Sequence, residues 1–189
     1  MRNFLELTFF KTVKQKNMRM HSETIQAMFG INHRIYLDPV PQARHRMNGH
    51  RAYDPSANHR VAVQQSVLRD LASSGVTNEM FPLTNSYVWI EMTFFISRPN
   101  SHFVNGDRNN IIRREYEDSM PTASGDIDNY VKLLLDALDG IFFRNDSNVI
   151  RIVATKLYCI EPDGRTVYNV HPYAMNTINL IDNDEENIM

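Results

Sequence analysis

The sequence predicts a single α+β domain of two layers, in which helices pack on one side of a small mixed or antiparallel sheet. Three observations lead to this prediction: an alternating apolar stretch at 86–97, two amphipathic segments at 56–73 and 126–139, and β-branched stretches after the second segment. Helices alternating with strands that have one polar face are typical of this architecture. The 189 residues, 42% of them hydrophobic, suffice for one such core and are few for two.

A basic β-hairpin is predicted ahead of the first long helix. Asn48-Gly49 separates two short basic runs, and Asn-Gly is a strong hairpin signal because both residues tolerate positive φ. Arg44, Arg46 and Arg51 flank this turn, where cationic side chains can contact DNA phosphates. A solvated ribbon without a ligand is the alternative. Strands are expected near 33–38, 43–47 and 50–53.

A helix and a long strand are predicted next. Asp54-Pro55 suits a helix start, since aspartate caps helices and proline fits their first position. Apolar residues one turn apart predict an amphipathic helix over 56–73. Alternation over 86–97 predicts a strand with one face buried.

The stretch 100–124 is polar and charged and has no clear period. Unstructured segments of this length are usually functional or disordered, so a long flexible loop is expected. Its Arg113 and Arg114 are further candidates for contact with DNA phosphates.

Residues 126–139 carry the clearest helical pattern, and we expect Gly140 to end the helix. The face predicted to pack on the sheet has Ile127, Val131, Leu134 and Leu138. The opposite face has Asp128, Lys132, Asp136 and Asp139. This spacing has a purely structural explanation that requires no metal or catalytic site. The acidic first turn caps the helix, and the charged stripe faces water. Strands are then expected at 149–160 and, at the sheet edge, at 165–171.

A metal site is the other interpretation of the acidic residues. Asp146 lies in the turn after the helix, and we expect the chain to return it beside Asp126 and Asp128. Converging carboxylates repel one another, and a divalent cation offsets that repulsion. Carboxylate oxygens suit Mg²⁺ or Mn²⁺. The seven histidines are scattered and form no zinc pattern.

The run GDIDNYVKLLLDALDGIFFRNDSNVIRIVATKLY resembles the core motif of the RusA family of Holliday-junction resolvases. The shared features are Asp-x-Asp-Asn, a lysine soon after, Leu-Asp-Ala-Leu, and a polar turn that leads into a strand. The resemblance implies that Asp126, Asp128 and Asp146 bind Mg²⁺, for which Mn²⁺ would substitute. It also implies that Lys132 is catalytic and that Asn129 supports the site from behind the ligands.

This resemblance implies a homodimer that nicks paired strands of a four-way DNA junction by metal-assisted phosphodiester hydrolysis. Gly125 departs from the family pattern, since many relatives have proline there, and Asn145 and Asn148 replace Asp and Gln in the turn. These departures keep open an alternative, a catalytically inactive protein that binds DNA junctions with a RusA-like fold. A haloacid-dehalogenase-type phosphatase is disfavoured, because its acidic pair follows a hydrophobic strand.

Composition and charge distribution also predict the organisation of the chain and its compartment. We expect a basic, possibly helical extension at 1–30, the nuclease domain at 31–175 and an acidic tail at 176–189. Residues 1–72 have 11 Lys/Arg against 5 Asp/Glu. No apolar run approaches the roughly 20 residues of a membrane span, and no secretory signal is expected, whereas organelle targeting stays open. The single cysteine, Cys159, is expected to be a core thiol and fits a reducing compartment.

Overall fold

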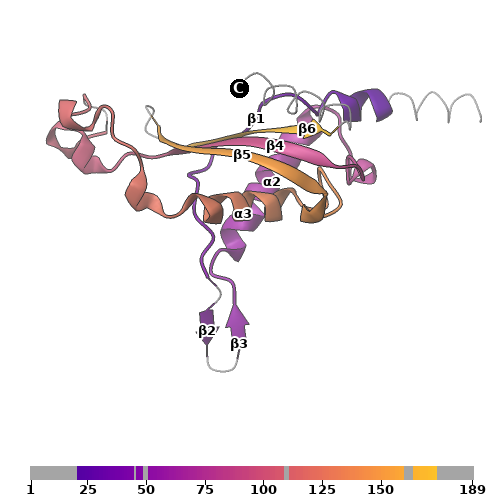
Figure 1. The fold of residues 1–189 in the computed structure, drawn as a ribbon, viewed down its shortest axis with the longest axis horizontal. Helices are drawn as coiled ribbons and strands as arrows, with labels where there is room; N and C mark the ends of the chain where they lie inside the picture. Colours follow the sequence, from indigo (N-terminus) through magenta and orange to yellow (C-terminus); the bar gives the residue numbers. More distant parts are fainter. Residues whose placement is uncertain (1–20, 45, 49–50, 109–110, 160–163, 174–189) are drawn as a thin grey trace, which may run out of the picture.

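The computed structural model describes residues 21–44, 46–48, 51–108, 111–159 and 164–173. A sheet lies over the helices α2 and α3, and a hairpin of β2 and β3 projects away on the helix side (Figure 1). The strands are β1 (His33–Ile35), β2 (Arg46–Asn48), β3 (Arg51–Tyr53), β4 (Val88–Ile96), β5 (Val149–Tyr158) and β6 (Arg165–Pro172). The long helices are α2 (Ala57–Ser73) and α3 (Ile127–Leu138), and residues 21–26 are also helical.

The main sheet is mixed and has the strand order β1-β6-β4-β5. β6 is antiparallel to β1 and β4, whereas β5 is parallel to β4. The parallel pair is joined through α3, which crosses the sheet between them as in other strand–helix–strand units. The predicted α+β class, with helices on one side of a mixed sheet, is therefore confirmed.

The prediction that 165–171 forms an edge strand is wrong. β6 lies between β1 and β4, and its register with β4 runs from Val88 opposite Pro172 to Phe95 opposite Arg165. Its side chains alternate between buried and half-buried positions, as in an interior strand with one covered face. β5 takes the edge instead.

The core lies between the helices and one face of the sheet. Buried residues alternate with partly exposed ones along β4, as predicted, and every second residue from Val88 to Ile96 is buried. From α2, Val63, Val67 and Leu71 complete this layer, which confirms the predicted helix. The residues of α3 in the core are Tyr130, Leu133, Leu134, Ala137 and Leu138.

The predicted inner face of α3 is only partly right. Leu134 and Leu138 are buried, but Ile127 is 38% exposed. The helix packs against α2 as well as the sheet, which turns the buried stripe toward Tyr130 and Leu133. The Tyr130 ring reaches Phe94 of β4, with ring centroids 5.4 Å apart. Ile127 is thereby left beside the open surface at the helix start.

The start of α2 differs from the cap predicted at Asp54-Pro55. The helix begins at Ala57 with Ser56 at the N-cap, and no side chain caps it. Asp54 instead accepts the backbone N–H of Ser56 at 2.8 Å and the Arg60 guanidinium at 2.9 Å. Aspartate thus supports the turn that precedes the helix, which is a common alternative use of this side chain.

The stretch 100–124 is more structured than its composition predicts. Its described residues form four 3₁₀ helices, namely η2 (Asn100–His102), η3 (Val104–Gly106), η4 (Arg114–Tyr116) and η5 (Thr122–Ser124). Arg98 is buried at the base of the stretch and donates to the carbonyl oxygens of Tyr116 and Glu117, at 2.7 and 3.2 Å. These charge-assisted bonds to carbonyl oxygens hold the segment against the body of the domain.

The remaining sequence predictions concern the two ends of the chain, the hairpin turn and Cys159. Most of the basic extension at 1–30, the turn residue Gly49 and the acidic tail at 176–189 lie outside the described residues. Cys159 is buried directly after β5, as expected of a core thiol. In the part of the chain that the structure describes, no helix combines the length and apolar character that spanning a membrane requires.

Candidate active site

Two carboxylates open helix α3. Asp126 is its N-cap residue and Asp128 lies in its first turn, and both are exposed. Within the described ranges, neither carboxylate forms an ion pair or accepts a hydrogen bond. Both line an open pocket of about 580 Å³, whose other wall is formed by Ala154, Thr155 and Lys156 of β5. The pocket therefore presents unneutralised negative charge at the N-terminus of a helix, where the macrodipole stabilises it.

The turn before Asp126 requires glycine. Gly125 has φ 106° and ψ 166°, which proline cannot adopt because its ring fixes φ near −65°. A Cβ at this position would lie 3.0 Å from Cγ of Pro41. The departure from proline at this position therefore reflects the backbone that this chain uses to reach its acidic pair.

Lys156 is a site residue that the sequence analysis missed. Its Nζ donates to the carbonyl oxygen of Gly125 and lies 5.8 Å from the centre of the Tyr130 ring. Lys156 pairs with Phe94 of β4, whose side chain faces the helices, so the pairing of the two strands places Lys156 on that side. The ammonium thus holds the turn that carries Asp126.

Tyr130, a buried residue of α3, also stabilises the turn before Asp126. Its hydroxyl donates to the carbonyl oxygen of Ser124. Burial raises the pKa of Tyr130 above its ordinary value, and the hydrogen bond to Ser124 opposes that shift without cancelling it. The phenol therefore stays protonated and remains a donor near neutral pH.

Lys132 lies one turn after Asp128 and is exposed. Among the residues that the structure describes, the two side chains form no ion pair with each other. The pairing that their i, i+4 spacing permits is therefore absent, and the Lys132 ammonium is available to another anion.

Asp146 does not join the other two carboxylates in this chain. It opens the 3₁₀ helix η6 (Asp146–Asn148) directly before β5, so it lies beyond Val149, whereas Asp126 and Asp128 lie beside Lys156. Lys156 lies seven positions after Val149 along the strand, which is roughly 20 Å. In Figure 1, the turn before β5 and the start of α3 lie at opposite ends of the helix. Over the described ranges, no group of three or more His, Cys, Asp or Glu side chains could hold a metal ion.

The direction of α3 explains why the expected convergence within one chain is wrong. A helix that connects two parallel neighbouring strands runs opposite to both. The turn at the end of α3 therefore starts β5 far from the beginning of the helix. Only the later residues of β5 return to Asp126 and Asp128.

The two asparagines of the turn stabilise its shape. Asn145 Oδ1 accepts the backbone N–H of Ser147 at 3.1 Å, and Asn148 Oδ1 accepts that of Asn145 at 3.3 Å. The Asn148 amide also donates to the carbonyl oxygen of Asn85 at 3.2 Å. These reciprocal bonds form a capping box, which leaves the Asp146 carboxylate exposed. Both departures from the family pattern thus act on the backbone.

The comparison with known protein families agrees with this layout. The family described as endodeoxyribonuclease RusA matches residues 37–167, which run from just after β1 through the hairpin, both long helices, β4 and β5 to the start of β6. The chain belongs to the RusA family. It is therefore an endodeoxyribonuclease by family, and the resemblance seen in its acidic motif is confirmed. The uncharacterized protein YqaN of Bacillus subtilis (strain 168) is 28% identical over 135 residues, which cover 70% of this chain and 90% of that protein.

In this RusA-family chain, the hairpin is rooted beside the acidic pair. Pro41 packs on Gly125, and the backbone N–H of Gln42 donates to the carbonyl oxygen of Asn129 at 3.0 Å. The first arm of the hairpin therefore contacts the first turn of α3 directly. The predicted supporting role of the Asn129 side chain stays a prediction.

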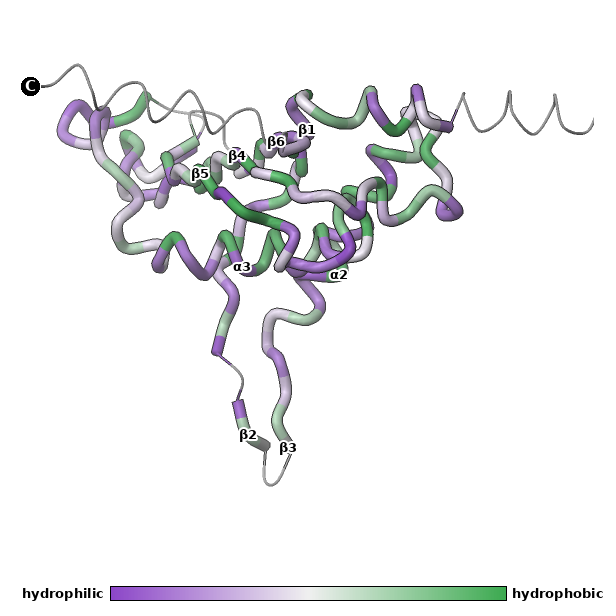
Figure 2. The backbone as a smooth tube through the Cα atoms, turned by 45° about the vertical axis from the view of Figure 1, so that its right-hand side comes forward, coloured by the Kyte–Doolittle hydropathy of each residue, from purple (hydrophilic) through white to green (hydrophobic). Residues whose placement is uncertain are grey.

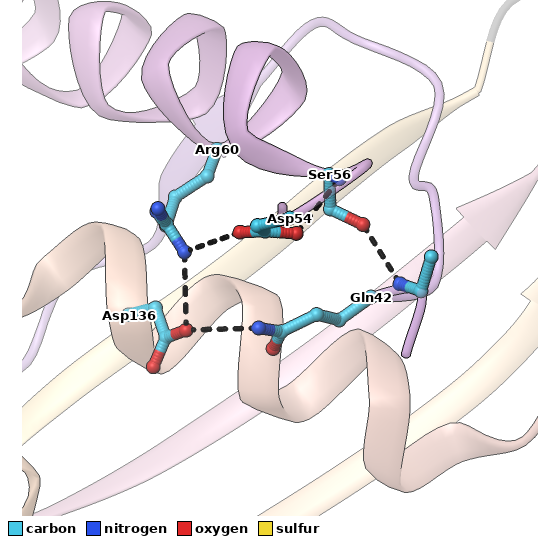
Figure 3. Close-up of polar contacts among 6 residues, drawn as sticks. Gln42, Asp54, Ser56, Arg60 and Asp136 are labelled. Atoms are coloured by element: carbon cyan, nitrogen blue, oxygen red, sulfur yellow. Dashed lines mark hydrogen bonds and ion pairs between the residues drawn. The ribbon is translucent and has the colours of Figure 1, made fainter. Parts of the chain in front are cut away.

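A polar network joins both hairpin arms to the two helices (Figure 3). Asp136 Oδ2 accepts the Gln42 amide at 3.2 Å and lies 3.6 Å from a guanidinium nitrogen of Arg60. The same Arg60 nitrogen lies 2.9 Å from Asp54. Asp136, predicted to face water with the rest of the charged stripe, thus links α3 to α2 and to the hairpin base.

The candidate DNA-contacting arginines of the RusA-family protein differ in their surroundings. Arg44 and Arg46 are exposed on the first arm of the hairpin, and Arg51 belongs to β3. Arg113 is exposed, but its Nε donates to the carbonyl oxygen of Phe103 at 3.1 Å. Arg114 is exposed in η4. The hairpin arginines therefore belong to the element whose base contacts the first turn of α3.

We expect Asp54→Ala to destabilise the RusA-family fold by about 1–3 kcal/mol, because it removes two bonds to a half-buried carboxylate and leaves Arg60 with one weaker partner. Asp118→Ala is the matched control, since Asp118 is exposed and makes no hydrogen bond or ion pair within the described ranges. Urea unfolding of both variants measures the effect. Equal midpoints for Asp54→Ala and the wild type would contradict the anchoring role of the network.

Proposed function

We propose that this protein is a Mg²⁺-dependent, structure-selective endonuclease that cuts four-way DNA junctions as a homodimer by paired phosphodiester hydrolysis. The observation that carries the proposal is the acidic pair itself. Asp126 and Asp128 are exposed, lack protein partners within the described residues, and share one open pocket at the root of a basic hairpin. Membership of the RusA family supports the junction as the substrate.

The donor chemistry of the pocket fits a hard divalent cation. Asp126 and Asp128 offer oxygen ligands only, and the pocket is open enough to leave room for water and a phosphate. Asp126 and Asp128 would hold the ion, with Mn²⁺ as a substitute for Mg²⁺, whereas Asp146 of the same chain lies at the other end of β5 and does not reach it. The chemistry that such an ion supplies is acidification of water and neutralisation of charge on the phosphate.

The two lysines at the site have different tasks. Lys132 is exposed and unpaired within the described ranges, so its ammonium can stabilise the negative charge that develops on the leaving oxygen. Lys156 holds the Gly125 carbonyl and thus positions Asp126. Lys132 is therefore a candidate catalytic residue, and Lys156 is a positioning residue.

The hairpin supplies the contact with the DNA backbone. Arg44 and Arg46 extend from the arm that packs against the first turn of α3, so phosphates bound along the hairpin lie on the side of the acidic pocket. Arg51 on the second arm would add to this surface. Contacts of this kind hold the duplex without reading its sequence, which suits selection by branched shape.

We expect Lys156→Met to lower the rate of junction cleavage by about ten-fold or more, because a displaced acidic turn misaligns the reacting groups. Lys156→Arg should recover most of the rate, since a guanidinium can donate to the same carbonyl oxygen. The measurement is kcat and KM on a labelled junction. A rise in KM with unchanged kcat would assign Lys156 to DNA binding instead of positioning.

The proposed function is tested by incubating the protein with a labelled four-way junction in Mg²⁺ and, separately, in chelator. A linear duplex of the same sequence is the control substrate. We expect symmetric nicks in the junction only, and none when the metal is removed.

The separation of Asp146 from the other two carboxylates favours one rival, a protein that binds junctions without cutting them. Tight binding with no nicks in either Mg²⁺ or Mn²⁺ would establish that rival. Equal cleavage of the junction and the linear duplex would refute structure selectivity.

A further inference from the structure

We infer that the open pocket at the start of α3 takes one unstacked DNA nucleotide, with its phosphate at Asp126 and Asp128 and its base against Met120 and Ile127. The inference rests on the proposed function and deepens it, because it names the part of a branched DNA that the site recognises. Met120 and Ile127 become specificity-determining residues, since a base face is available to them only where the base stack is open.

The first step is that the pocket combines acidic and apolar side chains. Met120 and Ile127 line it together with Asp126 and Asp128. Met120 is 60% exposed and Ile127 is 38% exposed. Figure 2 shows hydrophobic and hydrophilic residues interspersed along α3 and the backbone that leads into it. A hydrated cation and a phosphate can use the two carboxylates, but neither gains anything from the two apolar side chains. These side chains therefore indicate a ligand that also has an apolar group.

The second step is that the backbone on both sides of Met120 is anchored. The Met120 carbonyl oxygen accepts the backbone N–H of Thr122 at 2.8 Å, and the next residue, Pro121, is fully buried. On the preceding side, the buried Arg98 donates to the hydroxyl of Ser119 at 3.3 Å. The exposed Met120 side chain thus extends from a fixed base into the pocket mouth. A ligand that meets it does not have to order the chain first, which lowers the cost of binding.

The third step is that the size and chemistry of the pocket fit a nucleotide. Its volume of about 580 Å³ lies in the range of pockets that bind small molecules. A nucleotide has an anionic phosphate and an apolar base face a short distance apart, which matches carboxylates that can hold a cation beside apolar side chains. Methionine is flexible and polarizable, so it adapts to bases of different shape.

The fourth step is that such a pocket distinguishes branched DNA from a linear duplex. In a linear duplex, both faces of each base are covered by its neighbours, so Met120 and Ile127 have no base face to contact. At a branch point the stack is interrupted, and apolar side chains at an opened base step replace part of the lost stacking. The hairpin arginines, in contrast, can bind any DNA backbone. Selection by shape therefore falls to the apolar pair.

The decisive experiment compares the binding of two four-way junctions in chelator, so that no strand is cut. One junction is intact, and the other has an abasic residue in place of the branch-point nucleotide of each strand. We expect the wild-type protein to bind the abasic junction about ten-fold more weakly than the intact one, because the base contact is lost. The double variant Met120→Ser, Ile127→Ser should bind both junctions equally and about as weakly as the wild type binds the abasic one.

Ile111→Ser is the matched control, because Ile111 is an exposed apolar residue of the same stretch, at 78%, and does not line the pocket. It should keep the full preference for the intact junction. Met120→Leu should keep most of it, since leucine offers a similar apolar surface. Urea unfolding of each variant verifies that the fold is intact.

The inference would be overturned if the wild type bound the two junctions equally, or if the double variant kept the wild-type preference for the intact one. Cleavage in Mg²⁺ is a separate readout, in which the double variant should cut the intact junction about ten-fold more slowly than the wild type. If the wild-type protein fails to cut junctions, the proposed function fails on its own. The binding comparison then still decides whether the pocket takes a base.

Discussion

Asp128→Asn is expected to reduce junction cleavage by more than about a hundred-fold while leaving junction binding intact or slightly tighter. The substitution keeps the size of the side chain and removes one oxygen ligand and one negative charge. Loss of the ligand weakens the hold on a divalent cation. Loss of the charge lowers the repulsion between the pocket and a DNA phosphate. Single-turnover cleavage and a gel-shift titration measure the two effects.

Glu79→Gln is the control for this substitution, since it also neutralises one exposed carboxylate, but on a 3₁₀ helix between α2 and β4. It should leave cleavage and binding unchanged. Parallel losses of binding and cleavage by Asp128→Asn would instead indicate that Asp128 shapes the DNA surface, and the assignment of Asp128 as a metal ligand would be wrong.

Phe142→Ala is expected to lower the free energy of unfolding by about 3–5 kcal/mol, the range for removing a buried aromatic side chain. Phe142 is fully buried and meets the rings of His33 and Tyr168 edge-on, at centroid distances of 5.1 and 5.9 Å. It joins the end of α3 to the strands β1 and β6, so its loss opens a cavity where three elements meet. Urea unfolding or calorimetry measures the change.

Tyr36→Ala is the matched aromatic control, because Tyr36 is 70% exposed directly after β1. Its effect should stay within about 0.5 kcal/mol. A loss below about 1 kcal/mol for Phe142→Ala would show that the core repacks around the missing ring.

The elements of the fold were predictable from local patterns, but their neighbours in the sheet were not. Alternation along β4 and the apolar stripe of α2 identify both elements, because each buries one face. Nothing within β6 distinguishes an interior strand from an edge strand, since that depends on which residues outside it supply backbone partners. The face of α3 was misjudged at Ile127 for a similar reason, because packing against α2 is not visible in one helix.

The candidate site was predictable in its composition and not in its arrangement. The spacing of Asp126, Asp128 and Lys132 is local to one helix, so the sequence indicates their common exposure correctly. The location of Asp146 depends on the direction of a whole strand relative to that helix. Lys156 escaped prediction because a single lysine in an apolar strand resembles a solvent-facing residue until its partner strand is known.

Side-chain bonds to α2 and α3 hold the base of the hairpin. Substitutions at the base and substitutions at the tip should therefore have different effects on the fold. The residues that hold its base lie at Gln42, Asp54 and Ser56, outside β2 and β3 themselves. The tip can therefore gain, lose or exchange residues without disturbing the hydrophobic core or the acidic pocket. Exchanging the hairpin between relatives at these anchor points would therefore exchange the proposed DNA-contacting surface and leave the packing of α2, α3 and the sheet unchanged.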